Sequence, residues 1–134
     1  MIDLFVDGGA RGNPGLGGGG FVVFRDGKIV LKGERFFGKV TNNQAEYQAL
    51  IHALKQVKEK IGTPEIRCFM DSQLVVEQLN GRYKVKSPNV KPLFLEVQQL
   101  IGQFGSFTVS HVPREENALA DALANEAMYG GEPL

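Results

Sequence analysis

The chain has 134 residues, a length that suits one domain and leaves no room for two. Lysine plus arginine and aspartate plus glutamate number 15 each, so the formal net charge is zero. This balance argues against a protein that holds nucleic acid by its overall charge, and any such function must rest on local patches.

The remaining composition narrows the class of protein. Cys68 is the only cysteine, which excludes an intramolecular disulfide and a cysteine-based zinc site, and we expect it to be buried in a strand. Asp3 and Asp7 interrupt any apolar run at the start, and no stretch reaches the ~18 apolar residues of a membrane span. We therefore expect a cytoplasmic protein with one domain over residues 1–129 and a loose tail over residues 130–134.

The first third of the sequence is rich in strand and turn signals. The first strand is expected to stop at Asp7, and the Asp26-Gly27 dipeptide is typical of a tight hairpin. The expected elements are a strand at 2–6, a glycine-rich loop at 8–20 and hairpin strands at 21–24 and 29–37.

The rest of the sequence predicts helices that alternate with strands. A helix from Asn42 to about Ile61 starts with a capping box at Thr41 and Gln44. Its expected buried residues recur at helical spacing: Tyr47, Leu50, Ile51, Leu54, Val57 and Ile61. The elements expected after it are a strand at 65–70, a helix at 73–79, an irregular segment at 81–92, a helix at 93–104, a strand at 107–112 and a helix at 115–128. Because helices between strands require crossovers, part of the sheet must be parallel.

Four carboxylates occupy positions from which they could share one crevice. Asp7 and Asp71 each end a predicted strand, and ligands of open α/β sheets bind beyond the carboxyl ends of strands. Glu46 lies near the start of the long helix, and Asp121 lies early in the last helix, off the apolar stripe expected there. That expected stripe consists of Leu119, Ala122, Leu123 and Ala127.

Clustered carboxylates require either raised pKa values or a neutralising cation. All-oxygen ligands select Mg²⁺ or Mn²⁺ over Zn²⁺, and two such ions about 3.5–4 Å apart suit in-line phosphoryl displacement. Each group taken singly has another interpretation: an aspartate at a strand end caps a turn, Glu46 complements a helix N-terminus, and Asp121 is solvated. Spacing therefore suggests a metal site without establishing one.

Four motifs together resemble type 1 ribonuclease H, in a short form without the basic protrusion of some members. In chain order they are residues 5–15 (FVDGGARGNPG), 41–46 (TNNQAE), 71–73 (DSQ) and 116–124 (ENALADALA). The motifs span nearly the whole chain. The resemblance implies a ribonuclease H-like α/β fold, with a mixed five-stranded sheet of three antiparallel strands and then two parallel ones, flanked by helices.

The resemblance also implies an activity. The chain would be an endonuclease that hydrolyses the RNA strand of an RNA–DNA hybrid and leaves 5′-phosphate and 3′-hydroxyl ends. A metal-bound water would attack the scissile phosphate, and two Mg²⁺ ions would be held by Asp7, Glu46, Asp71 and Asp121. The protein would act as a monomer, with no membrane and no small-molecule cofactor involved.

The same resemblance implies contacts with the hybrid. The backbone at Gly8 and Gly9 could approach the RNA strand closely, because no Cβ obstructs it. Four amide side chains would contact sugars and base edges in the minor groove, where amides can recognise 2′-hydroxyls: Asn13, Asn42, Asn43 and Gln73. The alternative for these amides is loop and cap chemistry within the chain.

Two departures from the family pattern matter. Many members carry a histidine in a mobile loop before the last helix, but here that loop is short, and we expect Arg114 rather than His111 to lie near the scissile phosphate. A solvent-exposed arginine is the alternative. The second departure is a short basic stretch in place of the protrusion, with cations that include Arg82, Lys84 and Lys86. We expect this stretch to bind phosphates of the DNA strand. The alternative is a solvated loop.

Two other functions remain open. A non-catalytic nucleic-acid-binding domain of the same fold would not need four clustered acids. A different nuclease of the wider superfamily would not need the set of amides at the positions expected to contact a hybrid. The hybrid-specific enzyme is the hypothesis that uses both features.

Overall fold

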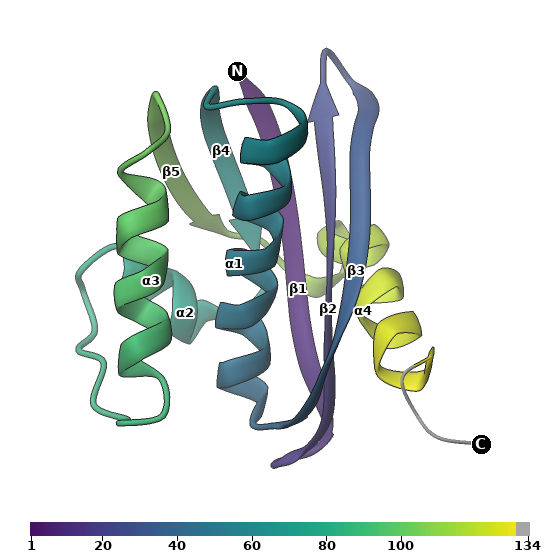
Figure 1. Cartoon of the computed structure of the whole chain (residues 1–134), viewed down its shortest axis with the longest axis vertical. Helices are drawn as coiled ribbons and strands as arrows, with labels where there is room; N and C mark the ends of the chain where they lie inside the picture. The colour runs from purple at the N-terminus through teal and green to yellow at the C-terminus, as the bar shows by residue number, and fades with distance from the viewer. Residues whose placement is uncertain (131–134) are drawn as a thin grey trace.

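The structure is a computed structural model that describes residues 1–130 (Figure 1). Its strands are β1 (Ile2–Gly12), β2 (Gly15–Arg25), β3 (Lys28–Val40), β4 (Glu65–Met70) and β5 (Ser106–His111). Its helices are α1 (Asn42–Lys60), α2 (Gln73–Leu79), α3 (Lys91–Ile101), the short 3₁₀ helix η1 (Arg114–Asn117) and α4 (Ala118–Gly130). The expected tail over residues 130–134 lies outside the described residues, apart from Gly130, which ends α4.

Within residues 1–130, five strands form one sheet in the order β3-β2-β1-β4-β5 (Figure 1). β1 pairs antiparallel with β2 and β2 pairs antiparallel with β3, whereas β1 with β4 and β4 with β5 are parallel. The parallel pairs follow from the helices between those strands, which act as crossovers. The expected mixed sheet of three antiparallel and two parallel strands is thereby confirmed.

Helices cover both faces of this sheet. A Cβ on Gly19 of β2 would lie 2.5 Å from Cβ of Ala49 in α1, whereas a Cβ on Gly20 would lie 2.5 Å from Cβ of Leu123 in α4. Because successive residues of a strand point to opposite faces, α1 and α4 lie on opposite sides of the sheet. In Figure 1, α1 and α3 are in front of the strands and α4 is behind them.

α1 begins and buries its apolar stripe as the sequence predicts. The Thr41 hydroxyl accepts from the Gln44 backbone N–H, and the Thr41 N–H donates to Gln44 Oε1, which completes the capping box. The predicted stripe is buried except for Ile61, which is partly buried. Cys68 is also buried, in β4, as expected.

The glycine-rich stretch is not a loop, contrary to expectation. β1 continues to Gly12 and β2 begins at Gly15, so the two strands pair as one long hairpin through residues 8–20. Glycine is depleted in strands, which is why the sequence indicated a loop. Here the missing side chains make room for α4: a Cβ on Gly18 would lie 2.8 Å from the Met128 backbone nitrogen. The helix and the sheet can therefore approach each other closely.

α4 buries a different stripe from the one expected. Its buried residues are Ala120, Ala124, Ala127 and Met128. Leu119 is 54% exposed, and of the expected stripe Ala127 alone is fully buried among the described residues. The face that meets the strand glycines carries mostly alanines, because bulkier side chains would not fit at this separation.

Smaller differences concern the ends of elements. α3 begins at Lys91, two residues before the expected start, with Pro92 in its first turn, where a proline removes no helical hydrogen bond. The last helix is preceded by η1 rather than being regular from residue 115. Of the helices in residues 1–130, none combines the length and the apolar character needed to cross a membrane.

Candidate active site

Asp7 and Asp71 occupy matching positions on neighbouring parallel strands. Val6 of β1 lies opposite Met70, the last residue of β4, so an aspartate follows each member of the pair. The expectation that Asp7 ends its strand was wrong, because β1 continues to Gly12. The parallel pairing does end at Val6, however, and this brings the two carboxylates to the same edge of the β1–β4 pair.

Glu46 and Asp121 come to this edge on helices from the two faces of the sheet. Glu46 lies in the second turn of α1, which packs directly on β1 because Gly8 has no side chain; a Cβ there would overlap the Ala45 carbonyl. Asp121 lies in the first turn of α4. Each helix thus contributes one acid to the strand pair.

All four carboxylates line one pocket of about 310 Å³. It is also lined by Gly8, Gly9, Ala10, Asn42, Arg114, Asn125 and Met128. The pocket therefore brings together the four predicted metal ligands, the predicted cation Arg114 and three of the predicted substrate-binding residues.

The pocket is electrostatically unfavourable for several ionised acids. Burial raises the pKa of Asp7 to about 8, and Asp71, Asp121 and Glu46 add to this shift. Burial also raises the pKa of Glu46 to about 7; a hydrogen bond with Ser72 opposes the shift and the charge of Asp71 adds to it. Without a neutralising partner, these two carboxyl groups hold protons near neutral pH.

The donor set fits a hard divalent cation. Glu46 Oε2 is buried and has no hydrogen-bond partner within residues 1–130, so a carboxylate oxygen is left without compensation. Oxygen ligands from Asp and Glu are those that Mg²⁺ and Mn²⁺ prefer. Within residues 1–130 no group of three or more His, Cys, Asp or Glu side chains is arranged to hold a metal ion, so the fit rests on the shared pocket and on the chemistry of the four acids.

Asn117 supports the site and was not singled out in the sequence. It is 1% exposed, and its Nδ2 donates to the Val6 carbonyl at 2.9 Å and to Asp71 Oδ2 at 3.4 Å. Its Oδ1 is buried without a partner among the described residues. One side chain thus joins the start of α4 to both aspartate-bearing strands. In the sequence, the one signal that could have indicated this role is the position of Asn117 four residues before Asp121.

Three of the four predicted substrate amides line the carboxylate pocket or a neighbouring pocket that shares Asn42 with it. Asn42 lines the carboxylate pocket, and its Oδ1 accepts from the Ala10 N–H at 2.9 Å. Asn13 Oδ1 accepts from the Asn42 N–H at 3.0 Å, which ties the β1–β2 turn to the start of α1. Asn13, Asn42 and Asn43 also line a second pocket of about 430 Å³ with Thr41, Ser87, Asn89 and Val90. Gln73 is exposed as the first residue of α2 and lines neither pocket.

Arg114 and His111 differ in position. Arg114 is the first residue of η1 and lines the carboxylate pocket. His111 ends β5, is exposed and does not line that pocket. Of the two, Arg114 is therefore the side chain that accompanies the four acids.

In the basic stretch after α2, one cationic side chain forms an ion pair and two are exposed without one. Arg82 Nε and Nη2 donate to the two Glu77 carboxylate oxygens at 2.6 and 2.8 Å. Lys84 and Lys86 are exposed and form no ion pair within residues 1–130. The Lys84 backbone carbonyl accepts from Gln78 Nε2 at 3.4 Å, which fixes the segment to α2. Arg82 is thus less available to a phosphate than the two lysines.

Comparison with known proteins places the chain in a family. The model of the family described as "Reverse transcriptase-like" matches residues 5–127. The bifunctional protein Rv2228c of Mycobacterium tuberculosis is 44% identical over 129 residues, which are 95% of this chain and 35% of that protein. Ribonuclease HI of Halobacterium salinarum is 42% identical over 128 residues, which are 95% of this chain and 64% of that protein. The chain therefore spans less than two thirds of the length of these relatives.

Solved structures match over nearly their whole length. RNase H1 of Halobacterium salinarum superimposes with a TM-score of 0.93 at 40% identity, over 97% of this chain and 98% of that one. LC11-RNase H1, solved in complex with an RNA/DNA hybrid, has a TM-score of 0.91 at 39% identity, over the same shares of the two chains. Sequence and structure agree, and the chain belongs to the ribonuclease H family of hydrolases, among its type 1 members.

Proposed function

We propose that this chain is an endonuclease that hydrolyses the RNA strand of RNA–DNA hybrids with the help of two divalent cations. The observation that carries the proposal is the pocket lined by Asp7, Glu46, Asp71 and Asp121, in a member of the ribonuclease H family. A pocket with four acids has little use for binding an anionic polymer unless cations mediate the contact. This argues for the enzyme over a non-catalytic binding domain of the same fold.

The four carboxylates would hold the cations, and Mg²⁺ or Mn²⁺ suits them. Two cations held by these carboxylates would neutralise the acids and would supply the Lewis acidity for attack of water on the phosphate, and 5′-phosphate and 3′-hydroxyl ends are the products we propose. Asn117 would orient Asp71 through the hydrogen bond to Oδ2. The orphaned Glu46 Oε2 is free to take a ligand position without breaking a hydrogen bond in the described chain.

The amides beside the pocket would select the hybrid. Asn13, Asn42 and Asn43 cluster where β1 turns and α1 begins, next to the acids. Short amides can both donate to and accept from 2′-hydroxyls, the groups that distinguish RNA from DNA. Gly8 and Gly9 would let the RNA backbone approach, and Gln73 would reach the hybrid from α2. LC11-RNase H1 was solved in complex with an RNA/DNA hybrid, which supports a hybrid as the ligand of this chain.

Arg114 would assist turnover as a cation near the scissile phosphate. It lines the same pocket as the acids, whereas His111 does not. Replacing Arg114 by alanine should slow turnover and leave the fold intact, because the side chain is exposed. An unchanged rate would remove Arg114 from the mechanism.

Lys84 and Lys86 would hold DNA-strand phosphates, with Arg82 in a lesser role because Glu77 already pairs with it. We further propose that one copy of a single domain, residues 1–129, acts alone on the hybrid in the cytoplasm without a small-molecule cofactor. In support, every acid and amide named above comes from the same chain.

The test is cleavage of an end-labelled RNA–DNA hybrid, beside duplex RNA and duplex DNA of the same sequence. With Mg²⁺ or Mn²⁺ the hybrid should be cut internally in its RNA strand, and a chelator should stop the reaction. Binding of all three duplexes without cleavage would favour the non-catalytic domain. Cleavage of duplex DNA in preference to the hybrid would favour another nuclease of the superfamily.

A further inference from the structure

Arg11 and Tyr129 form a contact beside the carboxylate pocket that none of the roles assigned above uses. Cζ of the Arg11 guanidinium lies 4.2 Å from the centre of the Tyr129 ring, which is a cation–π geometry. Arg11 is exposed, and Tyr129 is 58% exposed. Arg11 follows Ala10 in β1 and Tyr129 follows Met128 in α4, and both preceding residues line the pocket. The two side chains, which we name the rim pair, therefore border the pocket.

β1 and α4 run side by side from the acids to the rim pair. At the acids, Asp7 of β1 and Asp121 of α4 share a side-chain hydrogen bond. Further along, a Cβ on Gly9 would lie 3.7 Å from Cε of Met128. The rim pair is the next contact between the two elements. The acids and the rim pair are thus the two ends of one line of contacts.

The length of this line is the same along either element. From Asp7 to Arg11 the strand advances four residues, about 13 Å at a rise of about 3.3 Å per residue. From Asp121 to Tyr129 the helix advances eight residues, about 12 Å at about 1.5 Å per residue. Because alternate residues of a strand point to the same face, Arg11 also faces the same side of the sheet as Asp7. The rim pair therefore lies a few nucleotides away from a phosphate held at the acids.

The pocket extends from the acids towards the rim pair over a floor of small residues. Gly8, Gly9 and Ala10 line it on the β1 side, and Met128 lines it on the α4 side. Glycine and alanine leave room for the backbone of a bound polymer. A strand that leaves the acids along this floor next meets the rim pair.

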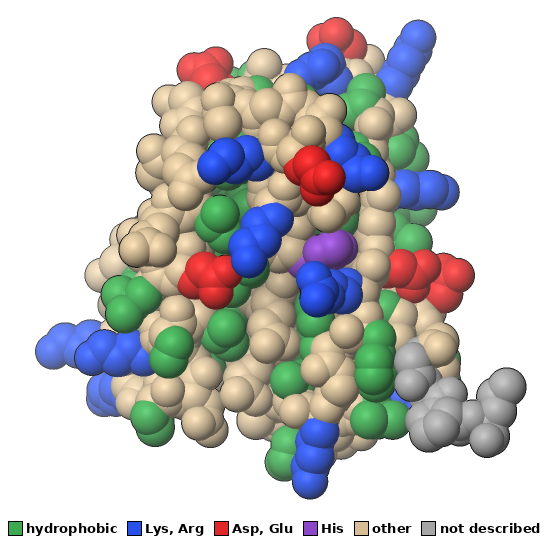
Figure 2. All heavy atoms as spheres, viewed as in Figure 1, with side chains coloured by type: hydrophobic (Ala, Val, Ile, Leu, Met, Phe, Trp, Pro, Cys, Tyr) green, Lys and Arg blue, Asp and Glu red, His purple; other side chains and the backbone are tan. Residues whose placement is uncertain are grey.

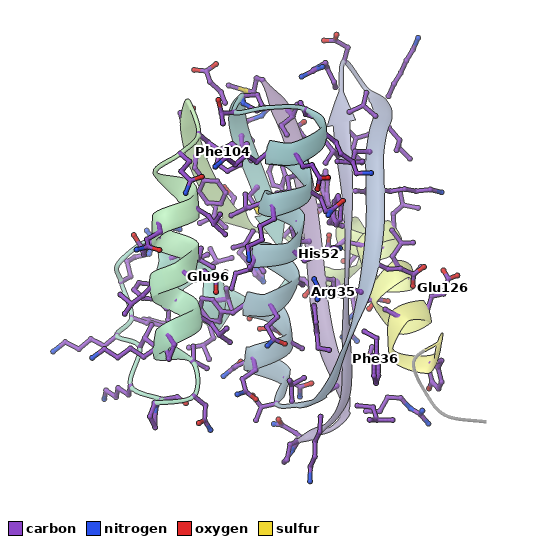
Figure 3. All side chains as sticks on the ribbon, viewed as in Figure 1. Arg35, Phe36, His52, Glu96, Phe104 and Glu126 are labelled. Carbon is purple, nitrogen blue, oxygen red and sulfur yellow. The ribbon has the colours of Figure 1, made fainter. Side chains whose placement is uncertain are left out.

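The opposite flank of α4 suits a phosphate less well. Glu126 lies there beside Phe36 of β3 (Figure 3), and both line a separate pocket that shares no residue with the carboxylate pocket. Burial and the charge of Glu126 raise the pKa of Glu34 in this pocket, so two acids accompany its one cation, Arg35. On the face formed by α1 and α3, basic side chains are spread among acidic ones (Figure 2). The flank of α4 that faces β1 is thus the better route for an anionic strand.

We propose that Arg11 binds a phosphate of the cleaved strand, a few nucleotides from the scissile phosphate, and that Tyr129 positions the guanidinium for this contact. The inference rests on the proposed cleavage of RNA–DNA hybrids. The Tyr129 ring covers one face of the guanidinium, whereas the N–H donors lie in the guanidinium plane and can pair with phosphate oxygens. Arg11 is therefore a substrate-binding residue, and Tyr129 is a positioning residue that acts through it.

The first test is kinetic and uses a hybrid whose cleaved strand carries one short block of ribonucleotides, so that the cutting site is fixed. Arg11→Gln should raise KM about fivefold, as for one exposed charge contact, and should leave kcat nearly unchanged because the metal ligands are intact. Tyr129→Leu should raise KM about twofold, whereas Tyr129→Phe keeps the ring face and should keep the unmodified KM. Lys28→Gln, which removes an exposed cation outside the carboxylate pocket, is the matched control for charge and should keep it as well.

The second test identifies the phosphate. Single phosphates of the hybrid are replaced by uncharged methylphosphonates, and binding is measured with a chelator present. One position in the cleaved strand, a few nucleotides from the cutting site, should weaken binding by the unmodified chain but not by Arg11→Gln. An effect confined to the other strand, or an unchanged KM in Arg11→Gln, would overturn the inference and leave the proposed function standing. Equal KM values for Tyr129→Leu and Tyr129→Phe would overturn the role of Tyr129, and no cleavage by the unmodified chain would overturn the proposed function and the inference together.

Discussion

Asn117 donates a hydrogen bond from Nδ2 to Oδ2 of Asp71 at 3.4 Å, and the same nitrogen donates to the Val6 carbonyl at 2.9 Å. Val6 precedes Asp7, and Asn117 immediately precedes α4, the helix that carries Asp121. One buried amide therefore relates the positions of three of the four acids. Such partners hold metal ligands in orientation, although they do not themselves bind the metal.

Asn117→Ala should impair both the fold and the site. Loss of a buried donor leaves the Val6 carbonyl unpaired and should lower the free energy of unfolding by about 1–3 kcal/mol. Hybrid cleavage at saturating Mg²⁺ should fall roughly 10- to 100-fold, as when partners of metal ligands are removed. Urea unfolding and cleavage rates measure the two effects. Asn80→Ala is the matched control, because Asn80 Nδ2 also donates to a backbone carbonyl, that of Val109 at 3.2 Å, and Asn80 does not line the carboxylate pocket. Equal loss of activity in both variants would contradict the role given to Asn117.

The stability of the metal-free protein should depend on the ionisation of Asp7. Burial raises its pKa from 3.8 to about 8, so the folded state keeps a proton that the unfolded state has lost. This contribution to stability is complete below pH 3.8 and is lost as the pH rises through about 8. Asp7→Asn should therefore gain stability relative to the unmodified chain between pH 5 and 8, by at most about 1.4 kcal/mol per pH unit. Urea unfolding in the presence of a chelator, at pH 5 and at pH 8, gives the free energy of unfolding of both proteins. If Asp7→Asn differed from the unmodified chain by the same free energy at both pH values, the prediction would be refuted.

Mg²⁺ should reverse this dependence in the unmodified chain. A cation that binds ionised carboxylates stabilises the folded state more as the pH rises. Thermal unfolding with and without Mg²⁺ should show a larger increase in Tm at pH 8 than at pH 5. The Asp7→Asn variant should show little increase at either pH.

The two exposed lysines and the paired arginine of the basic stretch should behave differently in binding. Lys84→Ala and Lys86→Ala should each reduce the slope of log K against log salt by about 0.9, the value for one lost phosphate contact. Arg82→Ala should leave the slope close to that of the unmodified chain, because Glu77 already engages the guanidinium. Hybrid binding over a series of salt concentrations, with a chelator present to prevent cleavage, gives the slopes. A larger change for Arg82→Ala than for the lysine variants would show that the Glu77 pair opens on binding.

A buried hydrogen bond between α1 and α2 should contribute to stability. Tyr47 Oη donates to Gln78 Oε1 at 2.7 Å, and both residues are buried. Tyr47→Phe leaves the Gln78 oxygen without its donor and should lower the free energy of unfolding by about 1–3 kcal/mol. Tyr83→Phe removes a hydroxyl from a side chain that is 49% exposed, and it should change stability by less than about 0.5 kcal/mol. Equal unfolding curves for the two variants would contradict this account.

The sequence predicted best where local and tertiary requirements agree. Thr41 and Gln44 form the capping box, and the helical spacing after them gives the buried face of α1. The order of strands and helices predicted the mixed sheet, because helical crossovers impose parallel pairing. The same parallel pairing places Asp7 and Asp71 at one edge of the β1–β4 pair, although β1 continues past Asp7 to Gly12.

The sequence failed where tertiary packing overrides local preference. Glycines 18 and 20 indicate a loop by propensity, yet they lie in β2 because α4 needs space that a side chain would fill. The same contact selects alanines for the buried face of α4 and leaves Leu119 exposed. Spacing within a single helix does not reveal which partner surface the helix will meet. Asn117 was missed for a similar reason, since both of its partners are far away in sequence.

The most direct measurement is a crystal of Asp71→Asn, soaked with Mn²⁺ and an RNA–DNA hybrid, because a variant that cuts slowly keeps the substrate intact. Anomalous scattering should reveal two Mn²⁺ ions about 3.5–4 Å apart, between Asp7, Glu46, Asp121 and the scissile phosphate. Manganese found elsewhere, with those three carboxylates free of metal and the hybrid bound away from them, would contradict the account.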